Sequence, residues 1–490
     1  MEQIRFDFNN MLSANVGKRH GVAKEDLKSA SAHAESAFRH FQRLIGDVHN
    51  RTNLNLEWVR LPFKNRIIID QVQELGDEIA SRYENVISLG IGGSYIGLKA
   101  AQDALCSPYH NEFAALRDGR PRMYFEGNNL DPETLSALLK KLDPKKTFVI
   151  VISKSGETIE TKSAFAVTRS WLKKGVGGLF GRHIFAITDL ESGALRAEVN
   201  KEHAKDPRGF YSLPLAKGVG GRYSELNIGL VHLAIMGISV RELLEGAQAM
   251  AARCASKGLS ENPALMYAVL QNTLYRKKGK TISVMMPFSE TLRSTADWYS
   301  QLLAESLGKK YYRKISQAAG GAESWAQDRA RIANVGRTPV SCRGTADLHS
   351  IHQNNIEGEN NKAITFIKVR EFRRDIRIPA GNGFLSGANY AKLLSLAEEA
   401  TEWSLTMESR PNCSITMPRV SPYHWGELIY FFEMATAFEG ELLNVNAFDQ
   451  PGVEGYKEYM YYKLRKPGIS RILQEEIQKH PLAKDKKFIL

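Results

Sequence analysis

The chain has 490 residues, of which 43% are hydrophobic and 24% are charged, and its formal net charge is +12. This length allows roughly three domains or two large ones, and the composition is that of a globular chain that buries its own cores. The positive charge suggests an anionic partner, but Lys and Arg form only short clusters, such as residues 277–280 (KKGK) and 484–487 (KDKK). No basic arm of the nucleic-acid-binding kind is present.

The cysteines and the N-terminus indicate a cytoplasmic protein. Cys106, Cys254, Cys342 and Cys413 are far apart and form no CxxC pair, so they indicate neither a zinc site nor a disulfide framework. Buried, reduced thiols are expected in a reducing compartment. The N-terminus has no signal-peptide pattern, and no segment approaches the roughly 20 apolar residues that cross a bilayer. We therefore expect no membrane association.

The predicted elements begin with a polar, helical segment, residues 1–60, in which residues 30–44 have amphipathic spacing. Short apolar strands then alternate with helix-compatible segments, which predicts right-handed βαβ units and a parallel sheet covered on both faces. Asp131 and Pro132 start one of these helices, as N-cap and first helical residue. The strands are predicted at residues 85–90, 122–126, 147–153 and 183–188.

The alternation returns in the second half of the chain, after a helical segment at residues 240–280. Strands are predicted at residues 281–287, 363–369 and 414–417, with helices at 295–308 and 425–438. The tail from residue 453 reads as helical, with a break at Pro467-Gly468. We therefore predict an α/β fold with two domains, each a mainly parallel sheet flanked by helices, and helical terminal segments. The expected boundaries are 1–60, 61–240, 241–445 and 446–490.

A glycine-rich turn, residues 90–94 (GIGGS), follows the first predicted strand and opens a helix, where backbone N–H groups favour an anion. A dinucleotide fingerprint would need glycine where Tyr95 stands, and a P-loop would need Gly-Lys-Ser/Thr where Leu98-Lys99 stands. Both nucleotide patterns therefore fail at a required position. A ligand-binding turn and a purely structural turn both remain open.

A second turn, residues 153–158 (SKSGET), lies at another strand end and helix start. Its hydroxyl groups, its glycine and its backbone N–H donors suit a phosphate monoester better than they suit an ordinary serine N-cap. In open α/β sheets, ligands bind at the carboxyl ends of strands, where both turns lie.

Together the two turns resemble those of the sugar isomerase (SIS) domain. Four further motifs, in order along the chain, resemble those of the glucose-6-phosphate isomerase family: residues 220–224 (GGRYS), 305–309 (ESLGK), 344–350 (GTADLHS) with Gln353, and 446–457 (NAFDQPGVEGYK). The chain departs from the family pattern at Lys217, Glu225 and Leu348, and the segment after GGR is about one residue shorter. These changes affect local loop geometry.

The resemblance implies two SIS-type domains and an isomerase that interconverts glucose 6-phosphate and fructose 6-phosphate without a metal or other cofactor. It implies that Glu305 is the base that transfers a proton through a cis-enediol, and that Arg222 stabilises the enediolate. It implies that His349, from the neighbouring subunit of a homodimer with shared active sites, opens the sugar ring with Lys457. The implied sugar and phosphate contacts are Gln450, Gly93, Ser94, Ser153, Lys154, Ser155 and Thr158.

Other functions remain as alternatives. A non-catalytic SIS-domain sugar-phosphate sensor usually has one SIS domain and an N-terminal helix-turn-helix, whereas this chain has two apparent domains together with Glu305, His349 and Lys457. A bifunctional phosphoglucose/phosphomannose isomerase shares the fold but differs in its active-site motifs. An amidotransferase-type synthase needs an N-terminal cysteine that this sequence lacks.

Overall fold

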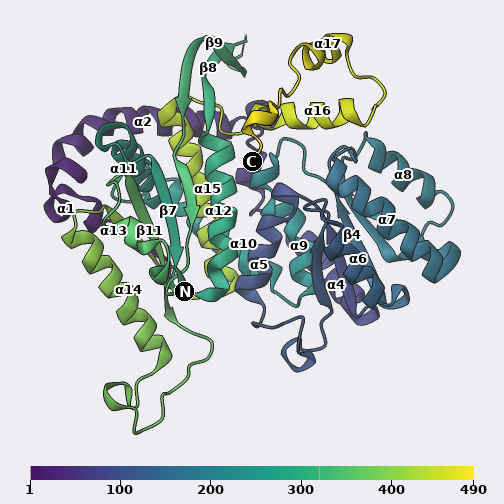
Figure 1. Ribbon diagram of the computed structural model, residues 1–490, viewed down its shortest axis with the longest axis horizontal. Helices are drawn as coiled ribbons and strands as arrows, with labels where there is room; N and C mark the ends of the chain where they lie inside the picture. The colour runs from purple at the N-terminus through teal and green to yellow at the C-terminus, as the bar shows by residue number, and fades with distance from the viewer. Residues whose placement is uncertain (1, 319) are drawn as a thin grey trace. The chain divides into compact units, whose positions relative to one another are not determined.

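The computed structural model describes residues 2–318 and 320–490 (Figure 1). The chain divides into two compact units after Ala447. Within the described residues, no helix has the length and apolar character needed to cross a membrane. The predicted domain boundaries at 60, 240 and 445 stay predictions.

The first sheet is entirely parallel, as the alternation in the sequence predicted, with strand order β3-β2-β4-β5-β6. Every residue of β2, β4 and β5 is buried, which explains why these strands read as continuous apolar segments. Its strands are β2 (Asn85–Leu89), β3 (Arg122–Glu126), β4 (Thr147–Ile152), β5 (Ile184–Thr188) and β6 (Tyr211–Pro214). The associated helices are α4 (Arg66–Arg82), α5 (Ile96–Leu105), α6 (Pro132–Lys141), α7 (Ile159–Val176), α8 (Ala194–His203) and α9 (Glu225–Ile235).

The second sheet has the order β1-β12-β11-β7-β10 and is parallel except for β1, which pairs antiparallel with β12. Its strands are β1 (Arg5–Asp7), β7 (Ile282–Pro287), β10 (Thr338–Ser341), β11 (Lys362–Glu371) and β12 (Asn412–Arg419). The structure thus adds a strand, β1, to a segment for which the sequence suggested helix. Between β1 and α4 the chain forms three α-helices, α1 (Ser13–His20), α2 (Lys24–Gly46) and α3 (Val48–Asn53).

A long helix, α15 (Pro422–Leu443), forms the centre of the larger unit. Almost all of its residues are buried, because α10 (Val240–Cys254), α11 (Pro263–Lys278) and α12 (Arg293–Leu307) pack against it. A helix that is covered on all sides is mostly apolar around its circumference, and α15 follows this pattern except for the buried Glu427, Glu433, Glu439 and Glu441. Two further helices accompany the second sheet, α13 (His352–Ile356) and α14 (Tyr390–Met407).

A two-stranded antiparallel hairpin, β8 (Lys309–Gln317) and β9 (Glu323–Val335), extends away from both sheets (Figure 1). Its base is fixed by Arg313, whose guanidinium donates to both carboxylate oxygens of Glu441 at 2.6 and 2.9 Å. The same guanidinium lies 4.1 Å from the ring centre of Trp325. The sequence did not predict this hairpin, because most of its side chains are exposed and carry no apolar pattern.

The smaller unit contains α16 (Glu454–Lys463) and α17 (Arg471–Lys479), separated by a turn in which Gly468 has φ 86°. The predicted break at Pro467-Gly468 is confirmed. In the larger unit all four cysteines are buried and unpaired, as expected, and burial raises the pKa of each thiol to about 12. Reactive thiolates at these positions are therefore excluded at neutral pH.

Candidate active site

The glycine-rich turn after β2 lies against the segment that carries Arg222. A Cβ atom on Gly93 would lie 2.1 Å from the carbonyl oxygen of Gly221, so only glycine permits this approach of the two backbones. Gly92 has φ 57°, which also favours glycine. Ser94 ends the short 3-10 turn from which α5 continues. This close contact fixes the position of the backbone from which the Arg222 side chain extends.

Arg222 is buried, and its guanidinium is held in three directions. Nε donates to Ser306 Oγ at 2.8 Å, Nη1 to Glu305 Oε2 at 3.2 Å, and Nη2 to the carbonyl oxygen of Ala447 at 2.6 Å. The exposed fraction of the residue is 2%. Because guanidinium keeps its charge at any physiological pH, this arrangement places a fixed positive charge beside the Glu305 carboxylate.

Glu305 lies in the last turn of α12, and its side chain remains 29% exposed. Gln301, one helical turn earlier, donates from Nε2 to Glu305 Oε1 at 2.9 Å, while Arg222 holds the other carboxylate oxygen. A Cβ atom on Gly92 would lie 3.1 Å from that same Gln301 amide. The carboxylate is therefore oriented at both oxygens and adjoins the glycine-rich turn. Sequence reasoning missed Gln301, although its i, i+4 spacing to Glu305 was a signal.

The second turn, between β4 and α7, uses its own hydroxyl groups to hold its shape. Ser153 Oγ accepts from the N–H of Gly156 at 3.0 Å, and Ser155 Oγ accepts from the N–H of Glu157 at 3.1 Å. A hydroxyl that accepts in this way keeps its own proton to donate to an anion. Gly156 has φ 74°, and its backbone packs against Leu195. Lys154 is exposed, and Thr158 is the N-cap residue of α7.

Both turns lie at the carboxyl edge of the first sheet, on neighbouring strands. β2 and β4 pair in parallel, with Leu89 opposite Val151, so residues 90 and 152 follow at the same edge. The chain leaves β2 towards β3 on one side and returns to β4 on the other. This reversal is the topological switch point at which open α/β sheets bind ligands.

His349 is exposed, in a short 3-10 turn (Ala346–His349) beyond the carboxyl end of β10. The end of β10 lies beside the middle of α12, since the hydroxyl groups of Ser341 and Ser300 are 2.9 Å apart. The N–H of Gly344 donates to the carbonyl oxygen of Pro287 at the end of β7. Among the described residues, no hydrogen bond or ion pair joins His349 to Glu305.

Gln450 and Lys457 belong to the smaller unit, which is described by itself. Gln450 directly precedes a 3-10 turn (Pro451–Val453), and Lys457 follows in the first turns of α16. Lys457 Nζ is paired with Glu454 Oε1 at 2.9 Å. Burial acts to lower the pKa of Lys457, but the hydrogen bond and charge of Glu454 outweigh it and raise that pKa.

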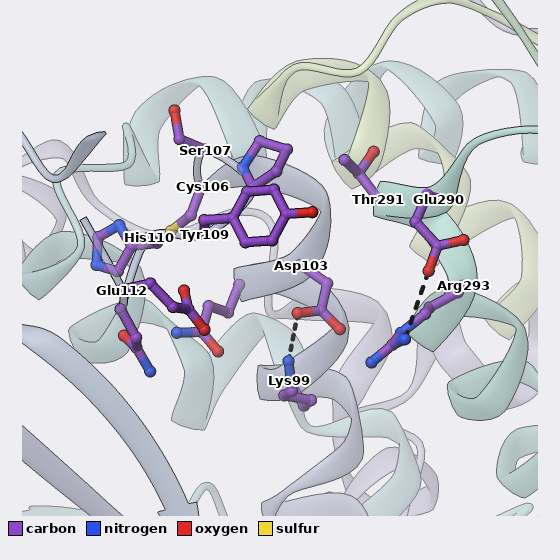
Figure 2. Close-up of a pocket in the computed structure, with 13 residues that line it drawn as sticks. Lys99, Asp103, Cys106, Ser107, Tyr109, His110, Glu112, Glu290, Thr291 and Arg293 are labelled. Carbon is purple, nitrogen blue, oxygen red and sulfur yellow. Dashed lines mark hydrogen bonds and ion pairs between the residues drawn. The ribbon is translucent and has the colours of Figure 1, made fainter. Parts of the chain in front are cut away.

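A separate cavity of about 480 Å³ lies at the other end of the α5–α12 pair from Glu305. Figure 2 shows Lys99 with Asp103 on one side, and Glu290 with Arg293 on the other. No predicted site residue lines this cavity, and four of its charged groups form two ion pairs, Lys99 with Asp103 and Glu290 with Arg293. It is distinct from the candidate active site.

These features define the class of protein: an α/β protein with two mainly parallel sheets, in which a glycine-rich turn adjoins a carboxylate held by a buried arginine and a second anion-favouring turn follows the neighbouring strand. A family model described as phosphoglucose isomerase matches residues 68–325 and 396–470. The chain belongs to the phosphoglucose isomerase family.

Individual relatives agree with this family. A protein of Carboxydothermus hydrogenoformans named glucose-6-phosphate isomerase is 36% identical over 99% of both chains, and one of Acetivibrio thermocellus is 32% identical over 96% of this chain and 97% of its own. The crystal structure of a hypothetical protein from Thermus thermophilus covers 94% of this chain and 100% of its own, with TM-score 0.78 and 31% identity.

Proposed function

We propose that the chain interconverts D-glucose 6-phosphate and D-fructose 6-phosphate, as an intramolecular aldose–ketose isomerase. The observation that carries this proposal is the Glu305 carboxylate, oriented by Arg222 and Gln301 beside the glycine-rich turn. It is the group the reaction requires, a base fixed next to a permanent positive charge. We place the reaction in the cytoplasm, in glycolysis and gluconeogenesis.

In the proposed mechanism the substrate's phosphate occupies the turns at residues 90–94 and 153–158, and Gln450 contacts the sugar. His349 and Lys457 transfer protons to and from the ring oxygen, so that the ring opens to a free aldehyde. Glu305 then removes the proton from C2; the C–H electrons form the C1–C2 double bond, and negative charge develops on the C1 oxygen, where Arg222 stabilises it. The proton of the C2 hydroxyl passes to the C1 oxygen, and Glu305 returns its proton to C1 while the C2 carbonyl forms, which gives the ketose.

We further propose that the active enzyme is a homodimer with shared sites. Two observations support this: His349 is exposed, and no hydrogen bond or ion pair joins it to Glu305 among the described residues of its own chain. A second copy can supply its own His349 to the site, since a two-fold dimer presents the same surface from both subunits. Each site would then combine groups from two chains.

The test measures turnover of fructose 6-phosphate by the wild type, by Glu305→Gln and by His349→Ala, with mannose 6-phosphate as a second substrate. Loss of a general base costs about 10²–10⁴-fold in rate, so Glu305→Gln should be nearly inactive while still binding the substrate. Glu133→Gln, at an exposed position, is the matched control. A Glu305→Gln enzyme that keeps most of its rate would contradict the base assignment.

Co-expression of Glu305→Gln with His349→Ala tests the sharing of sites. If His349 acts across the interface, one of the two sites in a mixed dimer has both native residues. Because random pairing makes half of the dimers mixed, about a quarter of wild-type activity should return. If His349 acts within its own chain, both sites of the mixed dimer lack one residue. Absence of any recovery in purified mixed dimers would therefore refute the shared site.

A further inference from the structure

Four cationic side chains meet where the strands of the second sheet begin. Lys280 precedes β7, Lys362 opens β11, Arg410 precedes β12, and Arg19 comes from the last turn of α1. Because these three strands are parallel neighbours, their first residues share one edge. The charges of Arg19, Lys362 and Arg410 all act on Lys280. We call Arg19, Lys280, Lys362 and Arg410 the four-cation cluster.

Lys280 forms the buried interior of this cluster, with an exposed fraction of 0%. Its ammonium group donates to the backbone and side-chain oxygens of Asn360, both at 2.5 Å, and lies 3.1 Å from His20 Nδ1. All three partners are uncharged acceptors. Burial, followed by the charges of Arg410, Arg19 and Lys362, lowers the pKa of Lys280 to about 8. No carboxylate is hydrogen-bonded to Lys280 among the described residues.

Arg410 leaves hydrogen-bonding capacity unused. Its Nε and Nη1 atoms are shielded from solvent and make no hydrogen bond among the described residues. Glu408 is close enough to act on Arg410 electrostatically, but no ion pair joins them in the described part of the chain. A shielded donor without a partner costs free energy, and a charged one costs more. Such a group needs a partner that the chain itself does not supply.

Two fully buried arginines, Arg337 and Arg313, differ from Arg410 because each is paired with a carboxylate. Arg337 donates to both carboxylate oxygens of Glu439 at 3.2 and 2.6 Å, and Arg313 is held equally by Glu441. In contrast, Lys362 Nζ reaches only the carbonyl oxygen of Glu359 and the side-chain oxygen of Asn361. Among the described residues, no carboxylate forms an ion pair with the four-cation cluster, while Glu359 and Glu408 act electrostatically on Lys362 and Arg410.

We propose that the four-cation cluster binds a phosphate-type oxyanion. A guanidinium fork matches two oxygens of such an anion, which suits Arg410, and the neighbouring Arg19 and Lys362 add charge at short range. Arg19 is exposed and Arg410 is half-buried, so an anion can reach them from solvent. The site lies apart from the two turns of the candidate active site, which belong to the first sheet. It also accounts for part of the basic cluster at residues 277–280.

Occupancy would connect the N-terminal segment to the second sheet. Arg19 and His20 end α1, which packs near α11 and α14, whereas Arg410 and Lys362 belong to the sheet edge. An anion shared by these groups would hold α1 against that edge. We therefore expect bound phosphate to slow hydrogen exchange in residues 13–20.

The test is equilibrium dialysis of labelled inorganic phosphate at constant ionic strength, with wild type, Arg410→Met and Lys140→Met. Lys140 is exposed on α6 and controls for the loss of one charge. Arg410→Met should bind about one phosphate per chain fewer than wild type, and Lys140→Met should match wild type. Equal stoichiometry for wild type and Arg410→Met would overturn the proposal, whatever the candidate active site binds.

Two further measurements sharpen the result. In phosphate-free buffer, the melting temperature of Arg410→Met should be at least as high as that of wild type. Added phosphate should raise the melting temperature of wild type by about 1–2 °C through Arg410, and Arg410→Met should lack this increase. Competition by glycerol 3-phosphate distinguishes a site open to phosphate esters from one limited to the free ion. Isomerase activity confirms that the variant is folded. A phosphate-induced rise of the same size in Arg410→Met would refute the site.

Discussion

Glu225 provides the sharpest stability prediction, because its carboxyl group is buried and burial outweighs the groups that favour its ionised form. It is the first residue of α9 and 3% exposed, and its side chain lies against Gly97. Neither of its carboxyl oxygens makes a hydrogen bond among the described residues, and nor does Oε1 of the buried Glu433. Burial raises the pKa of Glu225 to about 8, and burial together with the charge of Glu225 raises the pKa of Glu433.

The raised pKa of Glu225 determines the direction in which the stability of the protein changes with pH. In the unfolded chain Glu225 ionises near pH 4.5, whereas the folded state keeps the proton up to about pH 8. The stability contributed by this group is thus fully present below pH 4.5 and is lost as the pH rises to 8, by about 1.4 kcal/mol per pH unit. At pH 7 the loss is about 3 kcal/mol. With an unfolding entropy of about 2 cal/mol/K per residue, this corresponds to about 3 °C in the melting temperature.

The assay compares the melting temperatures of wild type and Glu225→Gln from pH 4.5 to 8. Glutamine keeps the shape but cannot ionise, so the variant should melt about 3 °C higher than wild type at pH 7 and equally at pH 4.5. Glu433→Gln should reduce the pH dependence as well, because the two groups titrate as a pair. Glu133→Gln is the exposed control. A difference between Glu225→Gln and wild type that does not change with pH would refute the reasoning.

Two other substitutions test the packing around the site and the hairpin. Gly93→Ala should lower both activity and melting temperature, because the new Cβ would meet Gly221 at 2.1 Å and displace Arg222; activity equal to wild type would show that the turn can relax. His40 lies between Glu441 and Glu323, and the hydrogen bond with Glu441 raises its pKa. The stability that protonated His40 contributes is therefore present below pH 6.5 and is lost as the pH rises through the raised pKa. Thermal unfolding should show that His40→Gln lowers the free energy of unfolding by about 1–3 kcal/mol at pH 6 and by less at pH 9.

The parts of the fold that the sequence predicted are those with a strong local pattern. β2, β4 and β5 are continuous apolar segments because helices cover both faces, and the Asp-Pro start of α6 has its own capping chemistry. β1 was not predicted, since three residues with one antiparallel neighbour carry too little pattern. The β8–β9 hairpin was not predicted either, because the contacts that fix its base, such as Arg313 with Glu441, join residues 128 positions apart.

The site was predictable only where function depends on a contiguous motif. The two turns follow from glycine and hydroxyl residues at strand ends, and the structure places them on neighbouring strands. The arrangement of Arg222, Glu305 and Gln301 required the fold, because it depends on how α12 packs on the segment after residue 220. The four-cation cluster was equally hidden, since its members are spread over almost 400 residues and meet only through parallel pairing of β7, β11 and β12.

The carboxylate of Glu305 also shows why a charged residue cannot be assigned from its own helix. Most of the buried face of α12 is apolar, and a glutamate at its end would ordinarily be a solvated charge. What distinguishes Glu305 is that both of its oxygens are occupied from fixed directions, by a buried guanidinium and by an amide one turn away. A base that moves one proton between adjacent carbons depends on such restraint, and this is the role that we propose for Glu305.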